Sequence, residues 1–392
     1  MKRLLYPLVL LVAVCASCTS SIEEPDPEPV EPPQPVDRTV IMFYPYSDLM
    51  SYFAQNITDF ASVFASHQSS GERIVVCIES TPDDVNVIEL VPQGAMCVKD
   101  TVDRFSNPQF ATTEGIRDML LRVVALAPAS TYSMIIGGHG MGWLPASTAT
   151  RSAHLKARRE IPVDALLTRY FGGLSAPYII DISTLAEGIE EAGLKMEYML
   201  FDDCYMSSVE VAYELRGVTD RLIACPTEVM AYGFPYHKCG EYLLGEPDYE
   251  KVCDEFYNFY ISYPSPYGTI AVTDCRKLDA LAEAVRQVNL TCGEEIVTGD
   301  VQTMDGYSPT IFYDMEDVVR HQCATTSDED LWTQFEAALA EAVPYKRHTP
   351  KYYSMRRGPH EIRTYGGITT SLTSANQLTS ELSDTEWYRA TH

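Results

Sequence analysis

Short runs of apolar residues alternate along the chain with segments in which apolar residues recur every three or four positions. Apolar runs predict strands at 39–46, 74–78, 133–137, 196–201, 221–226 and 269–273, with a hairpin at 85–91 and 95–98 and a late strand at 365–371. The helical spacing predicts helices at 49–66, 112–127, 182–192, 207–215, 249–263, 278–295 and 328–342. Because several strands are apolar throughout, we expect an α/β/α sandwich with a mostly parallel central sheet.

Two of these strands end in residues that carry chemistry. The strand at 133–137 is followed by Gly138, His139 and Gly140, and the strand at 196–201 is followed by Asp202, Asp203 and Cys204. In open parallel sheets the working residues lie beyond the carboxyl ends of the strands. The pattern therefore predicts that His139 and Cys204 meet at one edge of the sheet.

A cysteine and a histidine placed together suit nucleophilic catalysis on a carbonyl carbon. The thiolate attacks, the histidine manages the proton, and backbone N–H groups stabilise the oxyanion. We expect the N–H groups of Gly140 and Cys204 to form this oxyanion hole, and the start of the helix after Ser207 or Ser208 to favour the thiolate. Strand alternation predicts that Asp202 and Cys204 point the same way and Asp203 the opposite way.

A structural interpretation competes with each of these roles. A lone cysteine at the end of a strand is usually a small buried apolar residue, and a lone histidine near glycines is usually a hydrogen-bonded loop residue. Only the shared context of His139 and Cys204, each after an apolar strand and each at a turn, favours catalysis.

The N-terminal residues predict export. Lys2 and Arg3 precede an apolar stretch that is too short to span a membrane, and small residues precede Cys18. We expect residues 1–18 to be a lipoprotein signal peptide with Cys18 lipidated, the alternative being an ordinary secretory signal. Residues 19–37 are acidic and proline-rich, which predicts a tether, and residues 38–392 form the expected domain.

The composition of the chain limits which partners and cofactors we expect. The formal net charge is −26 over 392 residues, which argues against nucleic acid as a partner. Removing Cys15 and Cys18 from 11 cysteines leaves 9, so at least one thiol stays unpaired unless a bridge joins two chains. The remaining nine cysteines form no CxxC metal motif, and we expect neither a metal nor a cofactor.

The two catalytic blocks resemble a known family. Residues 135–143 read IIGGHGMGW and residues 199–215 read MLFDDCYMSSVEVAYEL, and both resemble the clostripain family (C11) of cysteine peptidases in clan CD. Residues 171–173, 180–193 and 225–236 are similar to the family as well. The resemblance implies a caspase-like fold, endopeptidase activity on protein or peptide substrates, and a dyad formed by His139 and Cys204.

The resemblance also implies cleavage after Arg or Lys, because acids line the family's specificity pocket. Asp202 matches one of these acids, and Glu228 is the nearest, looser candidate for the second. Some family members are cleaved at a basic residue between the two catalytic strands. The segment 146–173 is basic in an otherwise acidic chain, so self-processing there is expected, the alternative being a solvated loop. Its candidate residues are Arg151, Lys156, Arg158 and Arg159.

Three functional hypotheses follow. The first is an exported, lipid-anchored cysteine endopeptidase at the outer membrane or surface of a Gram-negative bacterium. The second is a surface-binding lipoprotein on a peptidase-like scaffold whose site is catalytically idle. The third is an amidase or acyl-transfer enzyme that uses the same pair of residues.

Overall fold

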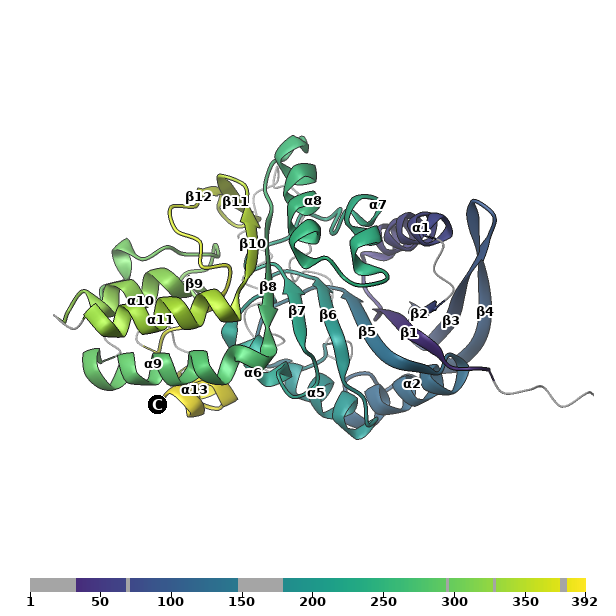
Figure 1. Ribbon diagram of the computed structural model, residues 1–392, viewed down its shortest axis with the longest axis horizontal. Helices are drawn as coiled ribbons and strands as arrows, with labels where there is room; N and C mark the ends of the chain where they lie inside the picture. Colours follow the sequence, from purple (N-terminus) through teal and green to yellow (C-terminus); the bar gives the residue numbers. More distant parts are fainter. Residues whose placement is uncertain (1–32, 68–70, 147–178, 294–295, 327–328, 374–378) are drawn as a thin grey trace, which may run out of the picture. The chain divides into compact units, whose positions relative to one another are not determined.

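Nine strands form one sheet in the part of the chain that the computed structural model describes, which is residues 33–67, 71–146, 179–293, 296–326, 329–373 and 379–392. The spatial order is β10-β8-β7-β6-β5-β1-β2-β3-β4 (Figure 1). The strands are β1 (Val36–Tyr44), β2 (Glu72–Thr81), β3 (Asp84–Gln93), β4 (Met96–Ser106), β5 (Ala129–Gly137), β6 (Met196–Asp202), β7 (Arg221–Ala224), β8 (Thr269–Asp274) and β10 (Tyr345–His348).

The five central strands run parallel to one another, and the outer strands pair antiparallel. Strands β2, β1, β5, β6 and β7 pair in parallel, whereas β3 and β4 on one side and β8 and β10 on the other pair antiparallel. The expected α/β fold with a central parallel sheet is confirmed, as is the hairpin. Two small sheets lie outside it, formed by β11 (Lys351–Ser354) with β12 (Gly358–Glu361) and by β9 (Tyr313–Asp314) with β13 (Thr369–Thr370).

Helices cover both faces of the sheet (Figure 1). On one face α1 (Met50–Ser66), α7 (Tyr236–Cys239) and α8 (Tyr249–Ser262) pack together, and on the other α2 (Thr113–Leu126), α5 (Ile182–Glu191) and α6 (Val209–Leu215) do so. The remaining α-helices are α9 (Leu278–Cys292), α10 (Met315–Cys323), α11 (Glu329–Ala342), α12 (Thr379–Ser383) and α13 (Glu386–Thr391). Short 3-10 helices lie at Gly240–Leu243, Cys275–Lys277 and Thr298–Asp300.

Burial explains the apolar runs. In β1 every residue from Arg38 to Tyr44 is buried, and β6 and β8 are almost wholly buried. A strand that is covered on both faces reads as a continuous apolar run because neither set of alternating side chains meets water. The parallel centre of the sheet is therefore also the centre of the core.

Side-chain caps begin two of the predicted helices. The Thr112 hydroxyl accepts a hydrogen bond from the Gly115 N–H at 3.1 Å, and the Ser208 hydroxyl accepts one from the Val211 N–H at 3.3 Å. The predicted strand at 365–371 is wrong in length, because only Thr369–Thr370 pairs. Gly367 has a φ of 83°, which breaks the extended backbone before that pair.

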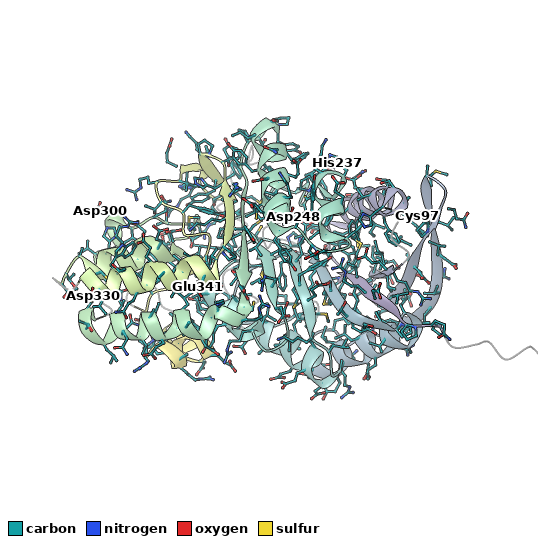
Figure 2. The ribbon with its side chains drawn as sticks, viewed as in Figure 1. Cys97, His237, Asp248, Asp300, Asp330 and Glu341 are labelled. Atoms are coloured by element: carbon teal, nitrogen blue, oxygen red, sulfur yellow. The ribbon has the colours of Figure 1, made fainter. Side chains whose placement is uncertain are left out.

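No disulfide bond joins any two of the nine cysteines of the described residues. Seven are buried, and Cys97 on β4, labelled in Figure 2, is half-buried like Cys292. In the part of the chain that the structure describes, no helix is long and apolar enough to cross a membrane.

Candidate active site

The register of the central strands brings the two sequence blocks together. Strands β5 and β6 are parallel neighbours, and Gly137 at the end of β5 pairs with Asp202 at the end of β6. His139 and Cys204 each follow two residues later. The two strand ends therefore deliver the histidine and the cysteine to the same edge of the sheet.

Gly140 lies directly against the backbone of Cys204. A Cβ atom at Gly140 would meet the Cys204 carbonyl oxygen at 2.1 Å and its nitrogen at 2.9 Å, so only glycine fits this contact. The close approach brings the backbone beside His139 to the backbone of Cys204. Both N–H groups of the expected oxyanion hole thus belong to one small region.

The Cys204 side chain is fully buried, and its sulfur contacts the next loop. The Val229 N–H donates a hydrogen bond to Sγ at 3.2 Å. Burial raises the pKa of the Cys204 thiol well above its usual value, and the Glu228 carboxylate raises it further. Burial and the nearby carboxylate therefore both act against the thiolate. The helix that is expected to favour it, α6, begins at Val209 as predicted.

His139 is held by a residue that the sequence did not single out. Its side chain is 4% exposed, and its Nε2 lies 2.6 Å from Oδ1 of Asp48, whose side chain is 62% exposed. The other ring nitrogen, Nδ1, is buried and has no hydrogen-bond partner among the described residues. One nitrogen of the ring is thus anchored while the other is left for chemistry.

A pocket opens beside these residues. His139, Gly138, Gly140 and Asp203 contribute to its wall. The rest of its lining is mostly apolar and comes from the ends of β1, β5 and β6 and from the start of α5: Phe43, Pro45, Tyr46, Ser47, Ile136, Met141, Gly142, Leu144, Ile179, Ile180, Ile182, Leu185, Phe201 and Met206.

Asp202 and Asp203 point to different loops. Asp202 accepts hydrogen bonds from the Phe234 N–H at 2.9 Å and from the Tyr236 hydroxyl at 3.3 Å, on the same side as the loop that contacts Cys204. Asp203 accepts a hydrogen bond from the Gly138 N–H, next to the histidine. The contacts agree with the alternation that the sequence predicts.

Neither candidate specificity acid lines the pocket. Asp202 is fully buried, and Glu228 is 3% exposed. The Glu228 carboxylate accepts hydrogen bonds from the Tyr205 hydroxyl at 2.8 Å and from the Met355 N–H at 3.0 Å. Asp203 is the acid that reaches the pocket wall.

Comparisons with known proteins place this geometry in a family. The model of the clostripain family, Peptidase_C11, matches residues 49–328. The chain belongs to the clostripain family of cysteine proteases. A comparison with curated proteins returned no match.

Solved structures of family members resemble this chain over most of its length. A secreted C11 cysteine protease from Bacteroides thetaiotaomicron, iotapain, is 45% identical, with a TM-score of 0.83 over 92% of this chain and 100% of its own. A clostripain from B. thetaiotaomicron ATCC 29148 in complex with the peptide inhibitor BTN-VLTK-AOMK is 51% identical, with a TM-score of 0.53 over 57% of this chain and 99% of its own.

An inactive zymogen C11 protease from Parabacteroides distasonis shares the fold. It is 24% identical, with a TM-score of 0.76 over 92% of this chain and 99% of its own.

Some sequence predictions fall outside the described residues. These are the lipidation residue Cys18, residues 19–32 of the tether, and the candidate processing residues Arg151, Lys156, Arg158 and Arg159. The end of the predicted tether is corrected by the structure, because β1 already begins at Val36. Among the described residues, no group of three or more His, Cys, Asp or Glu side chains is placed to hold a metal ion.

Sequence reasoning missed Asp48. It follows the apolar run of β1, as His139 follows β5, so the same strand-end rule would have found it. An acid before a helical segment is common at helix starts, so its position alone carries no functional signal.

Proposed function

We propose that this clostripain-family protein is a cysteine endopeptidase in which Cys204 is the nucleophile and His139 its proton partner. The observation that carries the proposal is the strand register, which puts both residues two positions beyond paired strand ends. The buried Nδ1 of His139, which has no hydrogen-bond partner among the described residues, supports the proposal. Such an atom lowers stability, so its presence calls for a functional reason.

The reaction follows from these groups. The thiol proton passes from Sγ to the imidazole, and the sulfur forms a bond to the carbonyl carbon of the scissile peptide. The oxyanion is stabilised by the N–H groups of Gly140 and Cys204. When the tetrahedral intermediate collapses, the carbon–nitrogen bond breaks and the imidazolium gives its proton to the leaving amine. Water then attacks the thioester, returning a proton to Sγ and releasing the acid.

The raised pKa of the Cys204 thiol implies that the free protein holds mostly the neutral thiol. Proton transfer to the histidine must therefore accompany the approach of substrate, in contrast to a preformed thiolate–imidazolium pair. The hydrogen bond from the Val229 N–H to Sγ favours the thiolate and lowers this barrier.

We further propose cleavage after Arg or Lys. The 51% identical clostripain was crystallised with an inhibitor whose peptide part, VLTK, ends in lysine. Asp202 lies on the same side of its strand as Cys204, so its carboxylate is the proposed partner of the basic side chain. A substrate would have to displace the Tyr236 hydroxyl from that carboxylate, whose contact at 3.3 Å is long.

Peptide hydrolysis tests both parts. Peptides with Arg, Lys or Met before the scissile bond are incubated with wild-type protein, Cys204→Ala and Asp202→Asn. We expect Cys204→Ala to abolish cleavage and Asp202→Asn to reduce cleavage after Arg and Lys far more than after Met. Turnover that survives in Cys204→Ala refutes the nucleophile, and equal losses on all peptides refute the role of Asp202. A wild type that cleaves simple amides but no peptide favours the amidase, and a wild type without any turnover favours the idle binding lipoprotein.

Export and processing complete the proposal. We propose that residues 1–18 direct export and that Cys18 anchors the protein by a lipid. We also propose that residues 19–35 form the tether to the peptidase domain, whose first strand begins at Val36, and that the protein cleaves itself within 146–173. The secreted relative supports export. Mass spectrometry of purified wild type after incubation, with Cys204→Ala as control, measures self-cleavage, and an intact wild-type chain rules it out.

A further inference from the structure

Three neighbouring strands end at the candidate site. Strand β1 lies between β2 and β5, and β5 lies between β1 and β6. Phe43 near the end of β1 pairs with Ile136 of β5, just as Gly137 of β5 pairs with Asp202 of β6. The loops after these strands carry Asp48, His139 and Cys204 respectively, in the same order in space as in the chain.

We propose that Asp48 is a positioning residue for His139, and that it fixes which ring nitrogen exchanges a proton with Cys204. The inference rests on the proposed function, since it concerns the same histidine. It adds a third member, from a third strand, to the pair that the sequence motifs identify.

The chemistry of the contact assigns the proton. A carboxylate can only accept hydrogen bonds, so the nitrogen that lies 2.6 Å from the Asp48 carboxylate must be the one that carries hydrogen. The neutral ring then holds its proton on Nε2 and has its lone pair on Nδ1. Nδ1 is the buried nitrogen without a partner among the described residues, so it is the atom left to take up the thiol proton.

The loop that presents Asp48 is held on both sides. Before it, the Tyr46 N–H donates a hydrogen bond to the buried carboxylate of Glu79 at 2.8 Å. After it, the Leu49 N–H donates to the Ser47 hydroxyl at 3.1 Å, and the Leu49 carbonyl accepts from the first turn of α1. A carboxylate on such a braced loop keeps its orientation, which is what a positioning group requires.

Charge strengthens the role during the reaction. When the thiol gives its proton to the histidine, the ring becomes an imidazolium, and the carboxylate on Nε2 stabilises that cation. Asp203 lines the same pocket and adds a second negative charge nearby, and Tyr46 is the remaining titratable group of the pocket wall.

The exposure of the Asp48 side chain predicts which kinetic constant changes when it is mutated. The Asp48 side chain is 62% exposed, so water screens the pair in the free protein. A peptide bound across the pocket, whose wall includes Tyr46, Ser47 and His139, would exclude that water and strengthen the contact. The stabilisation then grows between the free enzyme and the transition state, and we expect the loss on mutation in kcat rather than in KM.

The test uses three substitutions and one control. Asp48→Ala removes the contact, Asp48→Asn keeps an acceptor without the charge, and Asp48→Glu keeps the charge on a longer arm. We expect kcat for a basic peptide to fall about tenfold or more in Asp48→Ala, less in Asp48→Asn and least in Asp48→Glu, with KM within about twofold of wild type. The control is Asp59→Asn on α1, which weakens another aspartate–histidine contact, the one between Asp59 and His237 at 3.5 Å. His237 is labelled in Figure 2 and does not line the pocket. The kcat of this control variant should match wild type.

A second measurement does not depend on turnover. Iodoacetamide alkylates the thiolate form of cysteine, and peptide mapping follows Cys204 among the other thiols. We expect slower alkylation of Cys204 in Asp48→Ala than in wild type or in Asp59→Asn. Equal alkylation rates, or a rise in KM with kcat unchanged, overturn the role of Asp48. If cleavage is lost only in Cys204→Ala, the proposed peptidase function stands and the role of Asp48 is refuted.

Discussion

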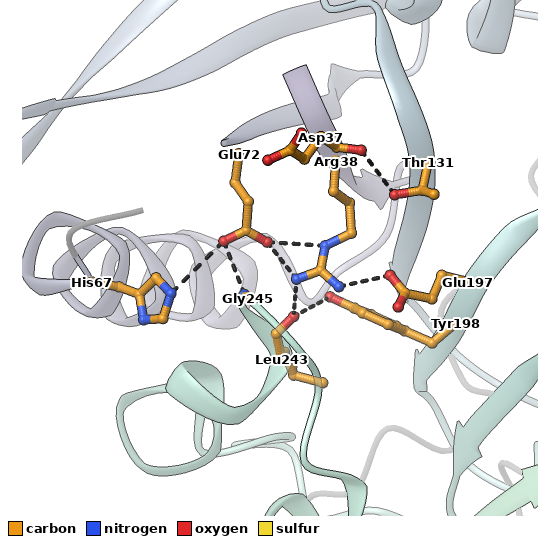
Figure 3. A network of polar contacts seen from close by, with 9 residues as sticks. All are labelled: Asp37, Arg38, His67, Glu72, Thr131, Glu197, Tyr198, Leu243 and Gly245. Carbon is orange, nitrogen blue, oxygen red and sulfur yellow. Dashed lines mark hydrogen bonds and ion pairs between the residues drawn. The ribbon is translucent and has the colours of Figure 1, made fainter. Parts of the chain in front are cut away.

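Two groups of buried polar side chains, one at the amino ends and one at the carboxyl ends of the parallel strands, differ in how their atoms are hydrogen-bonded. At the amino ends, the Arg38 guanidinium is buried and each of its nitrogens donates a hydrogen bond: Nε and a terminal nitrogen to Glu72, the other terminal nitrogen to Glu197 at 2.7 Å (Figure 3). Glu72 in turn accepts from the Gly245 N–H at 3.0 Å. At the carboxyl ends, His139 has a buried nitrogen without a partner among the described residues, and Cys204 is a buried thiol.

The difference separates stability from function. A buried charge that is fully paired resists any change of partner, and it ties β1, β2 and β6 to the segment after α7. A buried polar atom without a partner lowers stability and is tolerated where chemistry needs it. We therefore expect mutations at the amino end to change unfolding and mutations at the carboxyl end to change turnover.

The largest effect is expected at the amino end. Arg38→Ala leaves Glu72 buried without its partner, which costs about 3–5 kcal/mol in the free energy of unfolding. Urea denaturation measures this, and kcat/KM of the folded fraction should stay within about twofold of wild type. Arg286→Ala, which breaks an exposed pair with Glu283 on α9, is the control and should leave the free energy of unfolding nearly unchanged. A loss of turnover in folded Arg38→Ala would show that the two ends are coupled.

A smaller effect on stability and a larger one on turnover are expected at Gly140. The added methyl group of Gly140→Ala would collide with the backbone of Cys204, and the strain should cost about 1–3 kcal/mol. Peptide hydrolysis should fall more than tenfold, because the same displacement moves an oxyanion donor. Gly217→Ala is the matched control, since nothing lies within 4 Å of its added atom. Normal turnover in Gly140→Ala would remove this N–H from the mechanism.

The smallest effect is expected at Glu79, which anchors the loop carrying Asp48. Burial raises the pKa of the Glu79 carboxyl from 4.5 to about 7. The folded state therefore holds this proton more tightly than the unfolded state, and the stability that it contributes below pH 4.5 is lost as the pH rises through 7.

Glu79→Gln removes that titration. We expect the difference in unfolding free energy between pH 5 and pH 8 to shrink by on the order of 1 kcal/mol, a value reduced for partial solvation. Thermal melting at both pH values measures it, with Glu336→Gln on the exposed face of α11 as the control. An unchanged pH dependence would mean that Glu79 is ionised in the folded protein at pH 5.

Much of this arrangement is readable from residues in order along the chain. The apolar runs of β1, β5 and β6 predict buried parallel strands because such strands meet no water on either face. The side chains that follow them must then lie at one edge, so His139 and Cys204 could be paired by pattern alone. Local chemistry likewise predicts the helix caps at Thr112 and Ser208, which depend on residues three positions apart.

The tertiary structure decided what depends on contacts between distant segments. That Asp48 meets His139, 91 residues away, follows from β1 lying next to β5, and strand order is not encoded in any local pattern. The raised pKa of Cys204 comes from burial and from Glu228 on another loop, which no local pattern reveals. Likewise, Asp202 is engaged by Phe234 and Tyr236 and does not open to the pocket. The sequence determined which residues stand at the ends of the strands, and only the folded sheet decided which of them touch, because side-chain environment is set by neighbours in space.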